Sequence, residues 1–131
     1  ADLVLSLDIP ATIMDLSGLG VPDRFQGHSL RPLLVENGEW ARDDVFIQYF
    51  EDPPFPDLPT MTCLRTASEK LIHYLRDGEG DEFYDLVVDA EEQQNVIDDP
   101  AYSGRVTQMR NRLKAAKRQS DFSLPDLSRQ Y

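Results

Sequence analysis

The sequence predicts an α+β fold, in which a small antiparallel sheet of about four strands is packed by a long C-terminal helix and preceded by a strand–helix segment. Two observations predict the sheet and its helix. Short runs rich in β-branched and aromatic residues follow one another between residues 45 and 88, and turn-forming residues separate them. Beyond residue 99, apolar residues recur every three or four positions, which is the spacing of one helix face.

The first part of the chain is expected to form a strand, a short helix and an irregular connection. Residues 3–7 are an apolar run and are predicted as a short strand. Asp8 is the expected N-cap of a helix that ends at Gly18, a residue suited to the left-handed conformation beyond a helix end. The connection that follows contains one predicted buried helical turn, at residues 32–35.

Four strands are predicted in meander order, over residues 45–50, 61–66, 70–75 and 82–88. The acidic stretch 51–59 separates the first two strands, and its four prolines forbid regular structure there. A tight hairpin at residues 67–69 joins the middle pair, and a glycine-containing turn at 77–81 leads into the last strand.

The C-terminal helix is expected to be capped by Asp99 and opened by Pro100. Its apolar stripe consists of Tyr102, Val106, Met109, Leu113 and Ala116. A stripe of this kind is suited to covering one face of the sheet. The polar tail beyond residue 120 is expected to be loosely held.

The charge of the chain argues against two classes of partner. The formal net charge is -11, and such a surface repels nucleic acid and anionic membranes. No apolar run approaches the roughly 20 residues that span a bilayer. The first residues lack the basic start of a secretory signal, so we do not expect them to act as one. Basic residues gather in one late segment, residues 105–118, after an acidic segment at 77–99.

The residues by themselves predict no catalytic centre. Cys63 is the single cysteine, so it forms no intramolecular disulfide and is expected to be a buried, inert thiol. The cysteine content leaves the cellular compartment open. The two histidines, His28 and His73, do not have the spacing of metal ligands. There is no glycine-rich phosphate loop between a strand and a helix.

Four phrases, in order, resemble the C-terminal half of sulfatases. They are DIPATIMDLSG at residues 8–18, QGHSLRPLL at 26–34, LRT with KLIHY at 64–74, and YDL at 84–86 followed by Asp89, Glu92 and Asn95. Ala90, Val96 and Phe83 depart from the usual residues only conservatively in packing. His28 stands where the family often has arginine.

The resemblance implies that the chain is the C-terminal region of a sulfatase, a sulfuric ester hydrolase of the alkaline-phosphatase-like superfamily. Residues 1–43 would then be the end of the large α/β domain with its crossover connection. Residues 44–131 would be the C-terminal subdomain of antiparallel sheet plus helix. In sulfatases this subdomain packs on the catalytic domain and helps to form the substrate rim. Tyr49, to stack on a sugar or aryl group, and Arg65, to attract an anionic substrate, are the candidate rim residues.

The family's catalytic groups do not transfer to this chain. The resemblance implies a formylglycine made from a Cys or Ser in the motif C/S-x-P/A-x-R, and a divalent cation, usually calcium. The segment that starts at Cys63 departs from that motif at both the Pro/Ala and the Arg positions. We therefore predict no catalytic residue, metal ligand or cofactor in this chain, and we predict that the chain alone is inactive. Its expected partner is an N-terminal catalytic domain, which in the parent would bind the sulfate ester.

Two other interpretations stay open at this stage. The parent is alternatively a phosphonate monoester or phosphodiester hydrolase of the same superfamily, or the chain is a stand-alone protein-interaction module. On the sulfatase interpretation, residues 3–7 and the helix face of Ile9, Ile13 and Leu16 are expected to be covered by the large domain. The isolated chain is therefore expected to form a homodimer or to swap its first strand.

Overall fold

The structure is a computed structural model, and it describes residues 2–35, 38–40, 42–50, 58–75, 80–120 and 122. The chain divides into two compact units, Ala1–Asp43 and Asp44–Tyr131. Most of the predicted proline-rich loop, most of the turn at 77–81 and nearly all of the predicted tail lie outside the described residues.

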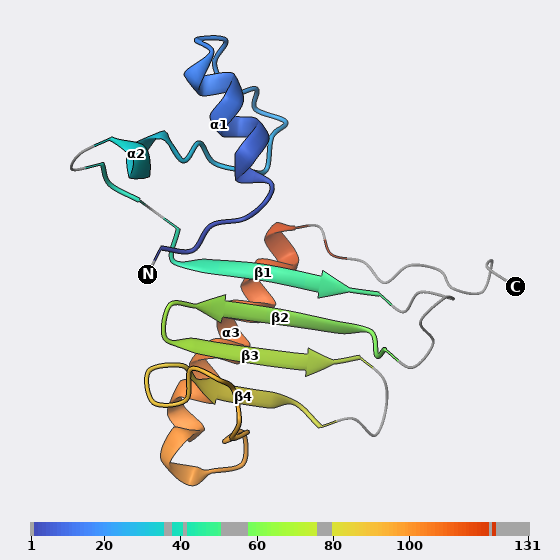
Figure 1. The fold of residues 1–131 in the computed structure, drawn as a ribbon. Helices are drawn as coiled ribbons and strands as arrows, with labels where there is room; N and C mark the ends of the chain where they lie inside the picture. Colours follow the sequence, from blue (N-terminus) through green and yellow to red (C-terminus); the bar gives the residue numbers. More distant parts are fainter. Residues whose placement is uncertain are drawn as a thin grey trace, which may run out of the picture. The chain divides into compact units, whose positions relative to one another are not determined.

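The first unit contains two helices, α1 (Asp8–Leu16) and α2 (Arg31–Leu34) (Figure 1). Gly18 follows the end of α1 with a φ of 73°, in the left-handed region that favours glycine. Its amide donates to the Asp15 carbonyl, and the Leu19 amide donates to the Met14 carbonyl. These two bonds satisfy carbonyls that the helix end leaves unpaired, and they confirm the predicted stop at this glycine.

The strand predicted over residues 3–7 is wrong. These residues form no strand, and the Leu3 carbonyl accepts a hydrogen bond from Trp40 Nε1 at 3.0 Å and another from Arg42 Nη1 at 3.3 Å. No strand is present elsewhere in the described part of the first unit. Without a neighbouring strand, the Leu3 carbonyl and the Leu5 amide bond to side chains instead of a ladder.

Asp8 was expected to be an N-cap, and this prediction is also wrong. Asp8 is the first residue of α1, and Leu7 occupies the cap position. The Asp8 carboxylate is fully buried and accepts hydrogen bonds from the amides of Leu5 and His28 at 2.7 and 2.8 Å. It also receives both terminal nitrogens of Arg42, with Nη2 at 2.7 Å from Oδ1. The bonds from Arg42, reinforced by the two amides, hold the pKa of Asp8 well below its usual range.

Two polar residues further along α1 complete a polar stripe that accepts hydrogen bonds from the segment after the helix. The Thr12 hydroxyl accepts from the Leu30 amide at 2.8 Å, and the Asp15 carboxylate accepts from the Ser29 hydroxyl at 2.6 Å. Together with the bond from His28 to Asp8, these contacts tie residues 28–30 to positions that share one face of the helix. The neighbouring, apolar face is exposed: Ile9, Ile13 and Leu16 are 55%, 59% and 59% accessible.

The helical turn predicted at residues 32–35 is present as α2, but it is not buried. Leu34 and Val35 are exposed to 67% and 56%. The apolar run therefore identified the local structure correctly and the burial incorrectly.

The second unit is a four-stranded antiparallel sheet with one long helix, as predicted. The strands β1 (Asp44–Tyr49), β2 (Met61–Thr66), β3 (Glu69–Tyr74) and β4 (Glu82–Asp85) pair in sequence order (Figure 1). All three pairings are antiparallel.

The last strand ends three residues earlier than predicted. The Asp85 carboxylate accepts a hydrogen bond from the Val87 amide at 3.1 Å, and the Asp85 carbonyl accepts from Val88 and Asp89. This turn takes the backbone out of the sheet, and it leaves Val87 and Val88 exposed.

A short 3₁₀ turn, η1 (Pro100–Tyr102), leads into α3 (Ser103–Gln119). The Asp99 side chain accepts from the Ala101 amide at 2.9 Å, so the predicted cap is present at the start of η1. The α-helix itself begins at Ser103, and Tyr102 before it makes no side-chain cap bond. The helix crosses one face of the sheet (Figure 1). The buried core consists of Leu64, Leu71, Phe83, Val106, Met109 and Leu113, with Tyr102 and Ala116 packed against it. The predicted stripe is therefore confirmed as the core side of α3.

Candidate functional site

The two faces of the sheet have different surroundings. Leu64, Leu71 and Phe83 point to the face that α3 covers. Because side chains alternate along a strand and the strands pair in register, the intervening residues share the opposite face, which we call the distal face. Its members are Val45, Ile47, Tyr49, Met61, Cys63, Arg65, Lys70, Ile72, Tyr74, Glu82 and Tyr84. Both candidate rim residues, Tyr49 and Arg65, lie on this face.

Arg65 belongs to a cluster of three charges. Strand pairing places Arg65 opposite Lys70. Glu92, from the turn after β4, receives Arg65 Nη1 at 3.2 Å on one oxygen and Lys70 Nζ at 2.5 Å on the other. The backbone of Glu92 has a φ of 56°, so the turn holds this residue in the left-handed region. One carboxylate thus binds two cations and leaves the cluster with a net charge of +1.

The exposure of the two cationic side chains determines whether they are available to a ligand. The Arg65 side chain is 42% exposed, and that of Lys70 is 21% exposed. A guanidinium has five N–H donors, and only one contact to Glu92 is made here. Arg65 therefore has donors and positive charge available for an anionic group.

Tyr49 and Arg65 do not form one site. Tyr49 is half-buried at the end of β1, where it pairs with Met61, whereas Arg65 pairs with Val45 near the start of β1. Four residues of strand separate the two positions, or about 13 Å. The structure places both residues on the same face but at opposite ends.

A second polar group on the distal face was missed by the sequence analysis. The hydroxyls of Tyr74 and Tyr84 donate to the two oxygens of Glu82, at 2.8 and 2.6 Å. Burial, followed by the hydrogen bond to Glu82, raises the pKa of Tyr84 far above its usual range, so this phenol stays protonated and acts as a fixed donor. Only the pairing of β3 with β4 brings these residues together. The signal in the sequence was the two-residue period that puts Glu82 and Tyr84 on one face.

Cys63 is buried, as predicted, with 2% exposure. Burial raises the pKa of its thiol to about 11. The thiol is therefore neutral at physiological pH, and a neutral, buried thiol is a poor nucleophile.

The described residues do not fit a calcium ion or a formylglycine. Among them, no group of three or more His, Cys, Asp or Glu side chains is arranged to hold a metal ion. His28 is an exposed residue of the first unit, and His73 contacts Asp81 through Nδ1 at 2.9 Å in the second. Cys63 is the one described residue of the type that formylglycine is made from in a cysteine motif, and its burial inside the sheet does not suit that role.

No helix in the described ranges is both long and apolar enough to pass through a bilayer.

Three kinds of likeness connect the chain to known proteins. Residues 1–119 match the protein family described as N-sulphoglucosamine sulphohydrolase, C-terminal. The chain is 29% identical over 125 residues to the N-acetylglucosamine-6-O-sulfatase of Bacteroides thetaiotaomicron, across 93% of this chain and 22% of that protein. The solved structure of BT4656 in complex with its substrate, D-glucosamine-2-N,6-O-disulfate, is similar to this chain. The TM-score is 0.80 and the sequence identity 28%, and the match covers 92% of this chain and 25% of BT4656.

A phosphonate monoester hydrolase is similar as well. The enzyme from Agrobacterium radiobacter has a TM-score of 0.67 and 27% identity, across 86% of this chain and 24% of that chain. In every one of these three proteins the chain spans a quarter of the length or less. What the chain shares with each relative is therefore one limited region.

Proposed function

This chain belongs to the family of N-sulphoglucosamine sulphohydrolase C-terminal domains, and on that premise we propose that it is the C-terminal part of a sulfuric ester hydrolase. The observation that carries the proposal is the family match over residues 1–119, which runs through both units. A sulfated saccharide is the substrate class that most of these relatives favour. One is named N-acetylglucosamine-6-O-sulfatase, another is named Delta 4,5-hexuronate-2-O-sulfatase, and a third is bound to a disulfated glucosamine.

We assign residues 1–43 to the end of a large α/β domain and residues 44–131 to the C-terminal subdomain. The division of the chain into units at residue 43 supports this assignment. The contacts of α1 support it as well. The polar residues of this helix bond to the segment that follows it, while the apolar side chains of Ile9, Ile13 and Leu16 are exposed. An apolar helix face of this kind is stabilised when another surface covers it. In the proposal, the catalytic domain provides that surface and also the formylglycine and calcium.

The proposed rim contacts come from the distal face. Arg65 has exposed donors and lies in a cluster with net positive charge, which suits a sulfate or carboxylate group of a saccharide. Tyr49 supplies an aromatic ring at the other end of β1. Since the two are about 13 Å apart along the strand, each would contact a different part of an extended substrate.

To test the proposed function, the 131-residue chain is compared with a longer polypeptide that also contains the proposed catalytic domain. Each is assayed on an aryl sulfate ester with added calcium. We expect turnover by the longer protein and none above buffer by the chain alone. Hydrolysis by the isolated chain would contradict the assignment of catalysis to another domain.

A phosphonate monoester hydrolase is the second candidate, favoured by the structural likeness to the enzyme from Agrobacterium radiobacter. The same assay on a phosphonate monoester separates the two candidates. Faster hydrolysis of the phosphonate than of the sulfate ester would favour the second.

Rim binding is tested with Arg65→Gln in the longer protein. We expect KM for a sulfated saccharide to rise several-fold while kcat changes little, because the lost contact is made equally in the ground state and the transition state. Arg118→Gln, which removes an exposed cation from α3, is the matched control. Equal KM values for Arg65→Gln and the unmodified protein would remove Arg65 from the rim.

A further inference from the structure

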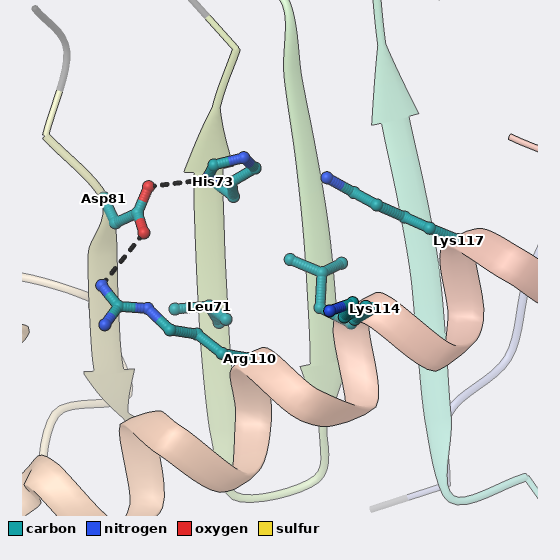
Figure 2. Close-up of a pocket in the computed structure, with 7 residues that line it drawn as sticks. Leu71, His73, Asp81, Arg110, Lys114 and Lys117 are labelled. Carbon is teal, nitrogen blue, oxygen red and sulfur yellow. Dashed lines mark hydrogen bonds and ion pairs between the residues drawn. The ribbon is translucent and has the colours of Figure 1, made fainter. Parts of the chain in front are cut away.

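A cationic pocket lies on the α3 side of the sheet, away from the distal face. It has a volume of about 230 Å³. Its polar lining consists of His73, Asp81, Arg110, Lys114 and Lys117, and two leucines of the core complete it. Figure 2 shows Arg110 reaching from α3 to Asp81, while the side chain of Lys117 extends across the sheet in the direction of His73.

The three cations come from one face of α3, because their positions are spaced by four and three residues. Asp81 is the one carboxylate in the lining. It is held by Arg110 Nη2 at 3.1 Å and by His73 Nδ1 at 2.9 Å. Even with His73 neutral, the lining has a net charge of +2, in a chain whose formal net charge is -11.

Two other basic residues of the helix have carboxylate partners, whereas Arg118 is exposed and lies outside the pocket. Arg105 contacts both Glu69 and Asp85, and Arg112 contacts Asp44 at 2.7 Å. Within the described part of the chain, no ion pair reaches Lys114 or Lys117. The helix dipole favours cations near a C-terminus, but it does not require them to line a cavity.

Lys117 is also partly withdrawn from water. Burial lowers the pKa of its ammonium group, and the nearby Asp81 carboxylate opposes that shift. The ammonium group lies over the Phe122 ring, 5.3 Å from its centroid, and no carboxylate is paired with it in the described residues. Because it has lost part of its hydration, it gains more from a bound anion than an exposed lysine would.

We propose that this pocket binds a tetrahedral oxyanion, sulfate or phosphate, either as the free ion or as the end group of a monoester. The ammonium groups of Lys114 and Lys117 would donate to its oxygens, together with N–H groups of Arg110 that do not contact Asp81. The volume is below the roughly 300 Å³ at which pockets for drug-sized ligands begin. It therefore suits an ion or an end group rather than a whole saccharide chain.

The experiment is a titration of the 131-residue chain with sodium sulfate and with a sulfate monoester, at ionic strength kept constant with sodium chloride. Amide chemical shifts of residues 110–117 and the His73 ring resonances report binding. We expect saturable shifts confined to these residues. Lys114→Gln is expected to weaken binding by about tenfold or more, as for the loss of a charge-assisted hydrogen bond. Lys114 is exposed, so this change leaves the core intact.

Lys117→Gln is the second variant, with the same expected loss. Arg118→Gln is the matched control: it removes an equal charge from the same helix end, outside the pocket, and is expected to change affinity by less than about twofold. Binding of the ester alone identifies an end group, binding of the ion alone identifies a free anion, and binding of both identifies the shared head group. Shifts that do not saturate with either ligand, or an equal loss in Arg118→Gln and Lys114→Gln, would overturn the proposal.

Discussion

The two units of the chain are stabilised in opposite ways. In residues 44–131, a core of six buried apolar residues lies between α3 and the sheet, and the charges form pairs around it. In residues 1–43, Ala11 is the only buried hydrophobic residue among those described. There the largest fully buried side chain is that of Asp8, bound to Arg42, and many large apolar residues are exposed. The second unit therefore has what a fold needs to be stable alone, whereas the first has a polar scaffold and an apolar surface.

The largest expected effect is in the second unit. Phe83 is fully buried between the sheet and α3, so Phe83→Ala is expected to cost about 4 kcal/mol of the free energy of unfolding. Urea denaturation followed by circular dichroism measures it. Val87→Ala, in the exposed turn after β4, is the control and should cost less than about 0.5 kcal/mol. Similar costs for the two variants would mean that the core described here does not hold the unit together.

The next effect concerns the polar scaffold of the first unit. Arg42→Ala leaves the Asp8 carboxylate buried without its cation, which costs about 3 kcal/mol. We expect amide hydrogen exchange to become fast in residues 2–35 and to stay slow in the strands of the second unit. Arg31→Gln is the matched control, because its pair with Asp15 is 3.4 Å long and exposed. Uniform loss of protection across both units would contradict the separation of the two.

A smaller effect tests the apolar surface of the first unit. We predict that the isolated chain forms a homodimer through the face of Ile9, Ile13 and Leu16, or through the segment that precedes it. Replacing all three by Ser removes on the order of 2 kcal/mol of association free energy. Light scattering at high micromolar concentration is expected to give a dimer for the parent chain and a monomer for the variant. A monomer in both cases would show that this face does not drive association.

The smallest effect is the response to acid. The pKa of Asp8 is lowered in the folded chain by Arg42 and two amides, so the ionised pair contributes its full stability above the pKa of the unfolded carboxyl, near 3.8. Below that pH the contribution is lost, by at most about 1.4 kcal/mol per pH unit for this group, until the folded pKa is reached. Hydrogen exchange at pH 5 and pH 3 measures the change in residues 2–35. Equal protection at the two values would show that folding does not lower the pKa of Asp8.

The local patterns of the second unit predicted its structure well. Alternating β-rich runs and the stripe on α3 predicted the strand order, the cap at Asp99 and the buried face of the helix, and all of these are confirmed. The sulfatase resemblance is confirmed at the level of the family. The periodicity of the apolar residues was sufficient to predict this unit, because the unit buries those residues against its own helix and strands. The face that the sequence pattern marks as apolar is therefore the face that packs.

In the first unit, local patterns were less reliable. Residues 3–7 have the composition of a strand, and Asp8 is a residue type that commonly caps helices, but neither forms the predicted structure. A strand needs a partner, and the described part of the unit has none. Whether Asp8 capped α1 or became a buried carboxylate depended on Arg42, which is 34 positions away in sequence.

The candidate sites separate in the same way. The sequence by itself predicted that Tyr49 and Arg65 lie in strands, that Cys63 is buried, and that basic residues gather at positions 105–118. The tertiary structure alone decided that Arg65 shares Glu92 with Lys70, that Tyr49 lies at the other end of the face, and that Asp81 joins His73 to Arg110 beside a pocket. The physical reason is that periodicity assigns a side chain to a face of its own element, whereas a site is made by the pairing and packing of different elements.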